Sequence, residues 1–217
     1  MKNNLIIFGD SFSTNFSVTN EINLEESWPV LLSNKLGYNL HNFANAGISN
    51  YGILNSIYNH LKFNELTKYD VVIIGFTFYD RLYDFWKNIG IDLKNNDTSS
   101  YSELETKFYQ YKQIDDDAMK KYTYNALLQY NFIINSLKKI TPNIFFWNMD
   151  NCEVSLFDEM IKNNTKNYIK PFDKLCWMDY CNETPEWCQS NNDKHFGKTG
   201  HLEFFQYLYE YIQKDLI

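Results

Sequence analysis

The chain has 217 residues, enough for one well-cored domain, and its 44% hydrophobic and 22% charged residues are typical of a globular protein. The formal net charge of -7 argues against a general nucleic-acid binder, which presents a basic face. We expect no membrane span, since no apolar stretch reaches about 18 residues, and a cytoplasmic location, since the N-terminal apolar run is too short for a signal-peptide core.

The first half of the chain alternates between predicted strands and helices. A short apolar run predicts a strand at residues 3–8, and apolar side chains at helical spacing predict a helix at residues 27–36. A second strand is predicted at residues 39–43, followed by a glycine-containing loop and a helix that ends near residue 62. The unbroken β-branched run within residues 69–76 is typical of a central strand that is buried on both faces.

The second half begins with a polar, acidic segment at residues 88–117, which we interpret as a surface excursion. A fourth strand is predicted at residues 143–148. Helices are predicted at residues 118–139, 154–162 and 199–214. The segment at residues 163–190 shows no clear periodicity and is interpreted as an insertion. Strands that alternate with helices indicate a parallel sheet covered on both faces, in one domain over residues 1–217.

Ser11 occupies the position that matters most for chemistry, because it stands directly behind the first predicted strand. Ligands of open parallel sheets bind at the carboxyl ends of the strands. A serine hydroxyl becomes a nucleophile when a histidine, oriented by an acid, removes its proton. His195 is the candidate base, with Asp193 or Asn192 as the group that orients it. We therefore expect Ser11 Oγ and His195 Nε2 to lie within hydrogen-bonding reach.

Acyl transfer to a serine also needs hydrogen-bond donors for the negative charge that develops on the carbonyl oxygen. The backbone N–H groups of Ser11 and Gly47 are candidates, since Gly47 lies in the loop after the second predicted strand. Thr77, at the end of the third predicted strand, could add a hydroxyl donor. These three residues form the predicted oxyanion hole.

The motifs that carry these candidates resemble the blocks of the GDSL/SGNH hydrolases. The run GDSFS at residues 9–13 is similar to the first block, NAG at residues 45–47 to the second, and HFGKTGH at residues 195–201 to the last. The blocks follow the family's order and span nearly the whole chain. The resemblance implies a three-layer, flavodoxin-like α/β/α fold with about five parallel strands. It also implies ester hydrolysis through an acyl-serine, with no metal and no cofactor.

Two positions depart from the family's pattern. The third block usually carries an asparagine after the third strand, and Thr77 stands in that place. Asn148 and Arg81 are other groups that could supply the missing donor. The family's acid usually precedes the histidine by three residues, a position that Asn192 occupies here, so we favour Asp193 as the orienting acid.

We therefore predict a serine hydrolase that cleaves carboxylic esters of small molecules or carbohydrates, with O-acetyl groups on carbohydrate as one candidate class. The aromatic content of 18% fits a sugar-binding surface, but we favour biased coding as its explanation, since Asn, Lys, Ile, Tyr and Phe are all abundant together. The alternative is a carbohydrate- or acyl-binding module, or an O-acyltransferase, on the same fold. Asp10 is expected to accept backbone hydrogen bonds near the turn, and His201 to be structural.

The cysteines offer a third interpretation. Cys176, Cys181 and Cys188 lie within thirteen residues, just before His195, and a zinc site would use these four side chains. The cysteines do not follow a standard zinc-ligand spacing, and disulfides are not expected in a protein without an export signal. We therefore predict reduced cysteines and no metal.

Overall fold

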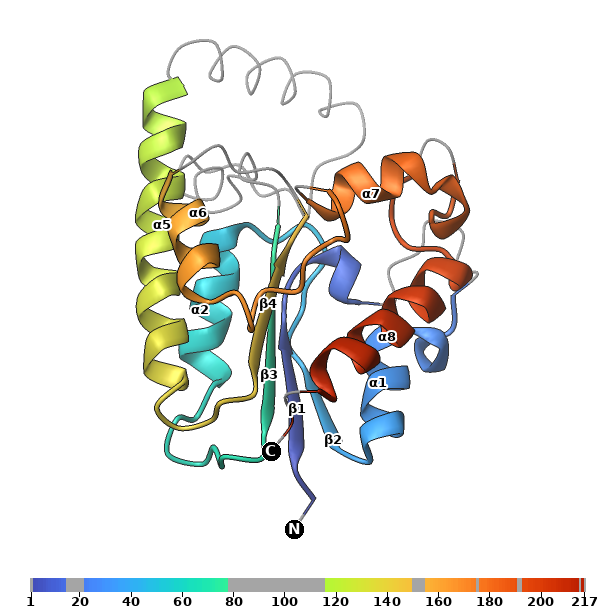
Figure 1. Cartoon of the computed structure of the whole chain (residues 1–217), viewed down its shortest axis with the longest axis horizontal. Helices are drawn as coiled ribbons and strands as arrows, with labels where there is room; N and C mark the ends of the chain where they lie inside the picture. Colours follow the sequence, from blue (N-terminus) through green and yellow to red (C-terminus); the bar gives the residue numbers. More distant parts are fainter. Residues whose placement is uncertain are drawn as a thin grey trace, which may run out of the picture.

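Four parallel strands form one sheet at the centre of the structure, in the order β2-β1-β3-β4 (Figure 1). The strands are β1 (Asn4–Phe8), β2 (Asn39–Asn42), β3 (Val71–Phe76) and β4 (Ile144–Asn148). Each neighbouring pair runs parallel. Beyond β4, one parallel bridge joins Phe146 to Tyr168, where a fifth strand would lie. The sheet of the described residues is thus close to the five strands expected.

This computed structural model describes residues 2–14, 22–77, 116–149, 155–174, 176–190, 193–214 and 216, with the side chains of residues 116–123 and 155 left aside. The predicted polar excursion at residues 88–117 lies outside the described residues, apart from its last two, which begin a helix. Arg81 and Asn192, which were candidates for the site, also lie outside them.

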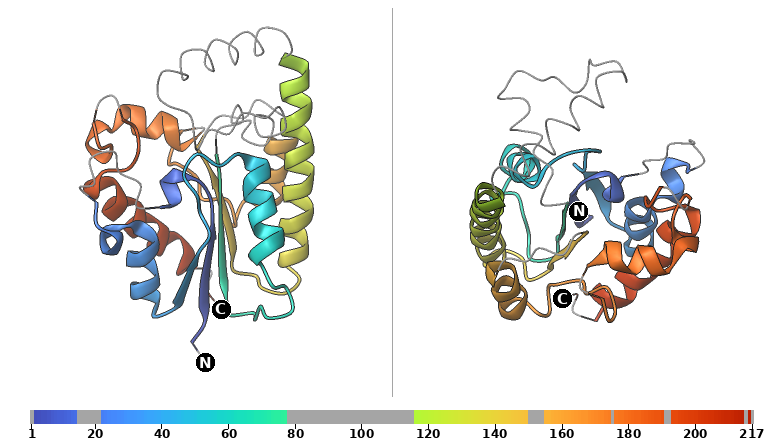
Figure 2. Two further views of the ribbon diagram at one scale, coloured as in Figure 1. Left: turned by 180° about the vertical axis from the view of Figure 1, so that it is seen from behind. Right: turned by 90° about the horizontal axis from the view of Figure 1, so that it is seen from above.

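Helices cover both faces of the sheet, which confirms the predicted α/β/α sandwich (Figure 2). One face carries α1 (Trp28–Leu36), α7 (Trp177–Glu183) and α8 (Lys198–Ile212). The other carries α2 (Asn50–His60), α5 (Asp116–Leu137) and α6 (Ser155–Asn163). Short 3-10 turns lie at η1 (Ser11–Ser13), η2 (Leu24–Glu26) and η4 (Pro185–Trp187).

The side chains of β1 show why the strands β1, β3 and β4 are mostly apolar in sequence. Leu5 and Ile7 pack into the core beneath α1 and α8, whereas Ile6 and Phe8 pack into the core beneath α2 and α5. Successive side chains of a strand point to opposite faces, and here both faces are covered. The same reasoning explains why every residue of β3 is buried.

The observed helices and strands agree with the predicted ones to within two residues at each compared end. The segment at residues 163–190, interpreted as an insertion, contains the bridge at Tyr168 together with α7 and η4. Several of its apolar residues join the core under α8, where Trp177 and Cys181 are fully buried. The segment shows no sustained helical or strand period, so the sequence pattern did not predict the burial of these side chains.

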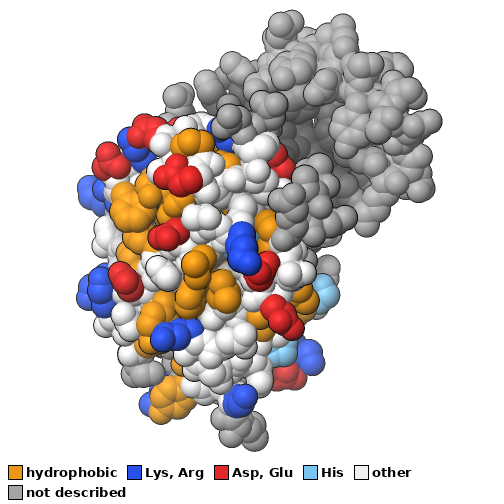
Figure 3. Space-filling view, turned by 90° about the vertical axis from the view of Figure 1, so that its right-hand side faces the viewer, with side chains coloured by type: hydrophobic (Ala, Val, Ile, Leu, Met, Phe, Trp, Pro, Cys, Tyr) orange, Lys and Arg blue, Asp and Glu red, His pale blue; other side chains and the backbone are white. Residues whose placement is uncertain are grey.

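The surface beside α1, α7 and α8 mixes acidic, basic and apolar side chains (Figure 3). Phe172 and Leu202 are large apolar residues exposed in this region, at 46% and 43%. Among the described helices, none has both the length and the hydropathy that a membrane crossing requires.

Candidate active site

Ser11 lies on a tight turn that leaves the carboxyl end of β1. Asp10 caps this turn: its Oδ1 accepts the N–H of Phe12 at 3.0 Å, and its main-chain oxygen accepts the N–H of Ser13 at 3.0 Å. Acidic and small polar residues favour such caps because their side chains satisfy the first free N–H groups. Asp10 therefore has the backbone-binding role that the sequence predicted for it, and it fixes the direction of Ser11.

The structure brings Ser11 and His195 together, although 184 residues separate them. His195 Nε2 lies 2.8 Å from Ser11 Oγ. The histidine sits on a small hairpin, in which Cys188 bridges Phe196 and the N–H of Gln189 donates to the His195 oxygen at 2.9 Å. This hairpin carries the imidazole back over the carboxyl end of the sheet.

Asp193 contacts the other nitrogen of the imidazole. Its Oδ1 lies 2.6 Å from His195 Nδ1 and also accepts the backbone N–H of His195 at 3.0 Å. Its second oxygen, Oδ2, is buried and has no hydrogen-bond partner among the described residues. In a neutral His195, the carboxylate favours the tautomer with the proton on Nδ1, which leaves Nε2 to accept from Ser11. This tautomer is the one a general base requires.

Phe12 supports the imidazole from one side. Its ring stacks on His195 with centroids 4.8 Å apart and an interplanar angle of 19°. The edge of Phe196 packs against Phe12 at 5.5 Å, so the aromatic contact continues from the histidine into the core. Packing of this kind holds the ring in one rotamer, which a base needs if it is to stay within reach of the hydroxyl.

His201 lies beneath the same region and is buried, with 1% of its surface exposed. Its Nδ1 accepts the backbone N–H of Trp28, the first residue of α1, at 3.3 Å. Burial lowers the pKa of His201 to about 4, because the charged imidazolium would lose its hydration. The neutral ring is thus a helix cap, in line with the structural role predicted from the sequence.

Gly47 lies in the loop after β2, with a φ of 76°, a conformation that favours glycine. The loop is held against the Ser11 turn by the N–H of Asn45, which donates to the Gly9 oxygen at 3.0 Å. Within the described residues, neither the Gly47 N–H nor the Ser11 N–H makes a hydrogen bond.

Thr77 directly follows β3 and is buried, with 4% of its surface exposed. Its hydroxyl was expected to face the oxyanion, and here it donates to Asp10 Oδ2 at 2.6 Å. Asn148, the other described candidate for the missing donor, lies at the end of β4, and its Oδ1 accepts the hydroxyl of Tyr168.

The comparisons with known proteins identify the fold. No protein-family model matches this sequence, and no curated protein does. A psychrotrophic esterase, EstA from Pseudoalteromonas sp., is similar in structure with a TM-score of 0.54 at 16% identity, over 98% of this chain and 97% of that one. A lipase/acylhydrolase from Enterococcus faecalis gives a TM-score of 0.58 at 12% identity, over 99% and 97%. An acetyl xylan esterase, AlAXEase, gives 0.51 at 14%, over 95% and 98%. This chain has the fold of solved ester hydrolases.

The cysteines predicted to be reduced are free and buried at positions 176, 181 and 188. Burial raises the pKa of the Cys176 thiol to about 11, which keeps it protonated at neutral pH. Cys188 donates to the main-chain oxygen of Cys181 at 3.5 Å. Among the residues that the structure describes, no three His, Cys, Asp or Glu side chains gather into a metal-binding group.

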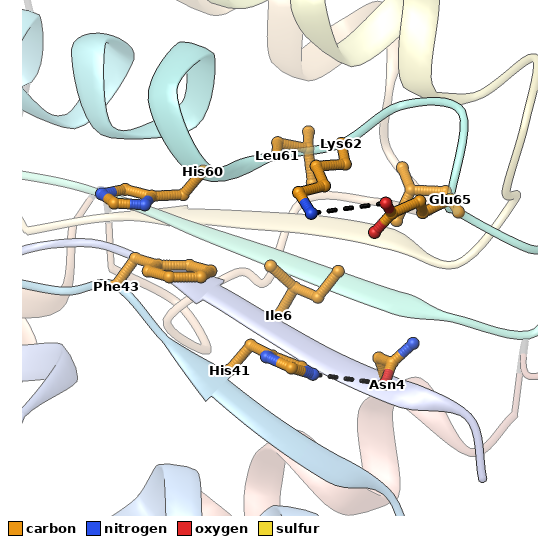
Figure 4. A pocket seen from close by; sticks show the side chains of 9 residues that line it. Asn4, Ile6, His41, Phe43, His60, Leu61, Lys62 and Glu65 are labelled. Atoms are coloured by element: carbon orange, nitrogen blue, oxygen red, sulfur yellow. Dashed lines mark hydrogen bonds and ion pairs between the residues drawn. The ribbon is translucent and has the colours of Figure 1, made fainter. Parts of the chain in front are cut away.

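A cavity of about 220 Å³ lies beside β1 and β2 (Figure 4), and Ser11 is not among the residues that line it. Ile6 and Leu61 line it together with the aromatic rings of His41, Phe43 and His60. The Phe43 ring stacks on His60 with centroids 4.5 Å apart. None of the predicted site residues lines this cavity, so it is separate from the candidate active site.

Proposed function

We propose that this chain is a serine hydrolase that cleaves carboxylic esters through an acyl-serine intermediate. The observation that carries the proposal is the unbroken chain of contacts from Ser11 Oγ to His195 Nε2, at 2.8 Å, and from His195 Nδ1 to Asp193 Oδ1, at 2.6 Å. The similarity in fold to solved esterases and lipases supports the same reaction class.

In the acylation step, Ser11 Oγ attacks the ester carbonyl carbon while its proton passes to His195 Nε2. The carbonyl oxygen becomes an oxyanion, for which we propose the N–H groups of Ser11 and Gly47 as donors. Collapse of the intermediate breaks the bond to the alcohol oxygen, and His195 returns the proton to that oxygen. Asp193 stabilises the imidazolium while it carries the proton.

In the deacylation step, a water molecule takes the place of the alcohol. His195 removes one proton from the water, and the resulting hydroxide attacks the acyl carbon. The second tetrahedral intermediate then releases the carboxylic acid, and the proton on His195 returns to Ser11 Oγ. The same nitrogen thus acts as base and acid in both halves of the reaction, and no other protein group needs to move a proton.

O-acetyl groups on carbohydrate are the substrate class we propose. The similarity to an acetyl xylan esterase supports this choice, and so does the 18% aromatic content, since aromatic side chains pack well against sugar rings. Acetyl is also a small acyl group, so a small pocket is enough to bind it.

The first test is turnover of p-nitrophenyl acetate by the wild type and by Ser11→Ala, compared at equal folded fractions. We expect Ser11→Ala to lose nearly all activity, because the remaining groups cannot form an acyl-enzyme. A fluorophosphonate probe should label the wild type at Ser11, as it reports an activated serine hydroxyl. Equal turnover by the two proteins would remove Ser11 from the mechanism.

A second function, binding of an acylated carbohydrate without hydrolysis, is favoured by one observation. The hydroxyl of Thr77 is engaged by Asp10, so two backbone donors remain for the oxyanion where three were expected. Loss of one such donor lowers turnover roughly 100- to 1000-fold. An unlabelled Ser11 would favour binding alone, whereas labelling with transfer to an added acceptor sugar would indicate an O-acyltransferase.

A further inference from the structure

A buried hydrogen-bond network joins the ends of β1 and β3 to the start of α2. Its centre is Thr77, whose hydroxyl donates to Asp10 Oδ2 at 2.6 Å. The main chain of Thr77 is held by the Asn50 carboxamide: the Thr77 N–H donates to Asn50 Oδ1, and Asn50 Nδ2 donates to the Thr77 oxygen, both at 3.0 Å. Tyr130 donates to the main-chain oxygen of Asn50 at 2.7 Å. A carboxamide that is bonded at both ends in this way is a two-point clamp on the main chain of one residue.

The network reaches the Ser11 turn through Asp10. One carboxylate oxygen of Asp10 accepts from Thr77, while the other accepts the N–H of Phe12 at 3.0 Å. Asp10 is 1% exposed, and hydrogen bonds to a buried carboxylate are stronger than those between neutral groups. Thr77 therefore fixes the carboxylate whose other oxygen shapes the turn.

The network also reaches the loop that carries Gly47. Asn50 is the first residue of α2 and stands three positions after Gly47. Ser49 caps the helix between them by accepting the N–H of Gly52 at 3.1 Å. The clamp between Thr77 and Asn50 thus connects the two segments whose N–H groups are the proposed oxyanion donors.

We propose that Asn50 and Thr77 are positioning residues, which set the Ser11 turn and the Gly47 loop at a fixed separation. The proposal rests on the esterase function proposed above. Thr77 acts through Asp10 and is not itself the third oxyanion donor, because a hydroxyl has one proton and this proton is given to a carboxylate. Thr77 would then hold Asp10 and the Ser11 turn in place, rather than donate a hydrogen bond to the oxyanion itself.

Four variants test this assignment. Thr77→Val keeps the side-chain shape and removes the donor, and Thr77→Ser restores the donor. Asn50→Ala removes the clamp, and Asn55→Ala is its control, since Asn55 is exposed on the same helix. Two experiments are done on each protein: amide hydrogen exchange in residues 9–14, and steady-state kinetics with p-nitrophenyl acetate, which give kcat and KM.

We expect exchange in residues 9–14 to become about tenfold faster in Thr77→Val, because a hydrogen bond to a charged group is lost. Asn50→Ala should change exchange in the same direction, while Thr77→Ser and Asn55→Ala should match the wild type. In Thr77→Val and Asn50→Ala, kcat should fall roughly 10- to 100-fold with little change in KM, since misplaced donors weaken the transition state more than the bound substrate.

Unchanged exchange in residues 9–14 in both Thr77→Val and Asn50→Ala would overturn the proposal. So would a fall in kcat for Thr77→Val alone, because a direct oxyanion donor needs no clamp at Asn50. If Thr77→Val does not fold, Asn50→Ala and Thr77→Ser decide the question. Hydrogen exchange does not depend on turnover, so a wild type without esterase activity would reject the proposed function and still leave the positioning role to be judged.

Discussion

The indole N–H of Trp28 donates to the main-chain oxygen of Phe12 at 2.8 Å, and this bond ties α1 to the turn that carries Ser11. Trp28 and Phe12 are both buried, at 0% and 2% exposure, so this hydrogen bond lies inside the core. The same tryptophan gives its backbone N–H to His201 on α8. One residue thus joins the serine turn to the helix that follows the histidine hairpin.

Trp28→Phe should destabilise the protein by about 2 kcal/mol, because it removes a buried hydrogen bond and leaves a small cavity. We also expect slower labelling of Ser11 by a fluorophosphonate, since the turn loses the hydrogen bond from Trp28 to the Phe12 oxygen. Trp177→Phe is the matched control, because Trp177 donates to the Ile169 oxygen at 3.2 Å, in a contact that does not involve this turn. Equal labelling rates in the two variants would show that the Trp28 bond contributes to stability alone.

Asp193→Asn should lower kcat by about 10³- to 10⁴-fold, since an amide can hold the wrong tautomer of His195 and cannot stabilise the imidazolium. Asp193 is the residue to test because its Oδ1 lies 2.6 Å from His195 Nδ1. Glu203→Gln, an exposed carboxylate on α8, serves as the control for the loss of one negative charge. Retention of full activity by Asp193→Asn would transfer the orienting role to another group.

The burial of His201 predicts a loss of stability in acid. Its pKa is lowered to about 4 in the folded protein, against 6.5 as the ordinary value, so the unfolded chain binds the proton first. The contribution of the neutral His201 to the free energy of unfolding is complete above pH 6.5. It declines as the pH falls toward 4, by about 3 kcal/mol in total.

His201→Asn tests this dependence, because an asparagine oxygen can accept from Trp28 without titrating. The free energy of unfolding, measured by denaturant titration from pH 7 to 4, should fall more steeply in the wild type than in His201→Asn. Parallel curves for the two proteins would contradict a buried neutral imidazole at this position.

Gly200→Ala should destabilise the protein by about 3 kcal/mol and disturb the histidine hairpin. A Cβ at Gly200 would lie 2.1 Å from the main-chain oxygen of Trp187, and this oxygen also accepts the N–H of Gly197 at 2.7 Å. The clash is with backbone, so it cannot be relieved by a side-chain rotation. Glu203→Ala, exposed on the same helix, should leave the melting temperature within about 2 °C. If Gly200→Ala melts at the wild-type temperature, Gly200 does not pack closely against the main chain of Trp187.

The fold was largely predictable because its signals are local. Three of the four strands are short apolar runs, β2 being mostly polar, and each long helix repeats apolar residues at its own period, so most of the sheet and its two helical layers follow from the sequence. The segment at residues 163–190 was the exception. Its burial depends on a few aromatic side chains such as Trp177, whose ring packs against Phe204 and Tyr207 of α8, far away in the sequence.

The sequence by itself determined which residues are candidates for the chemistry: Ser11 after the first strand, and His195 before the last helix. Only the tertiary structure decided which atoms meet, since that depends on side chains brought together across the sheet edge. It placed Asp193 against His195 and gave the Thr77 hydroxyl to Asp10, a partner 67 residues away in the chain. A motif records residue type and order, whereas a hydrogen bond is set by distance and direction, which arise when the chain folds.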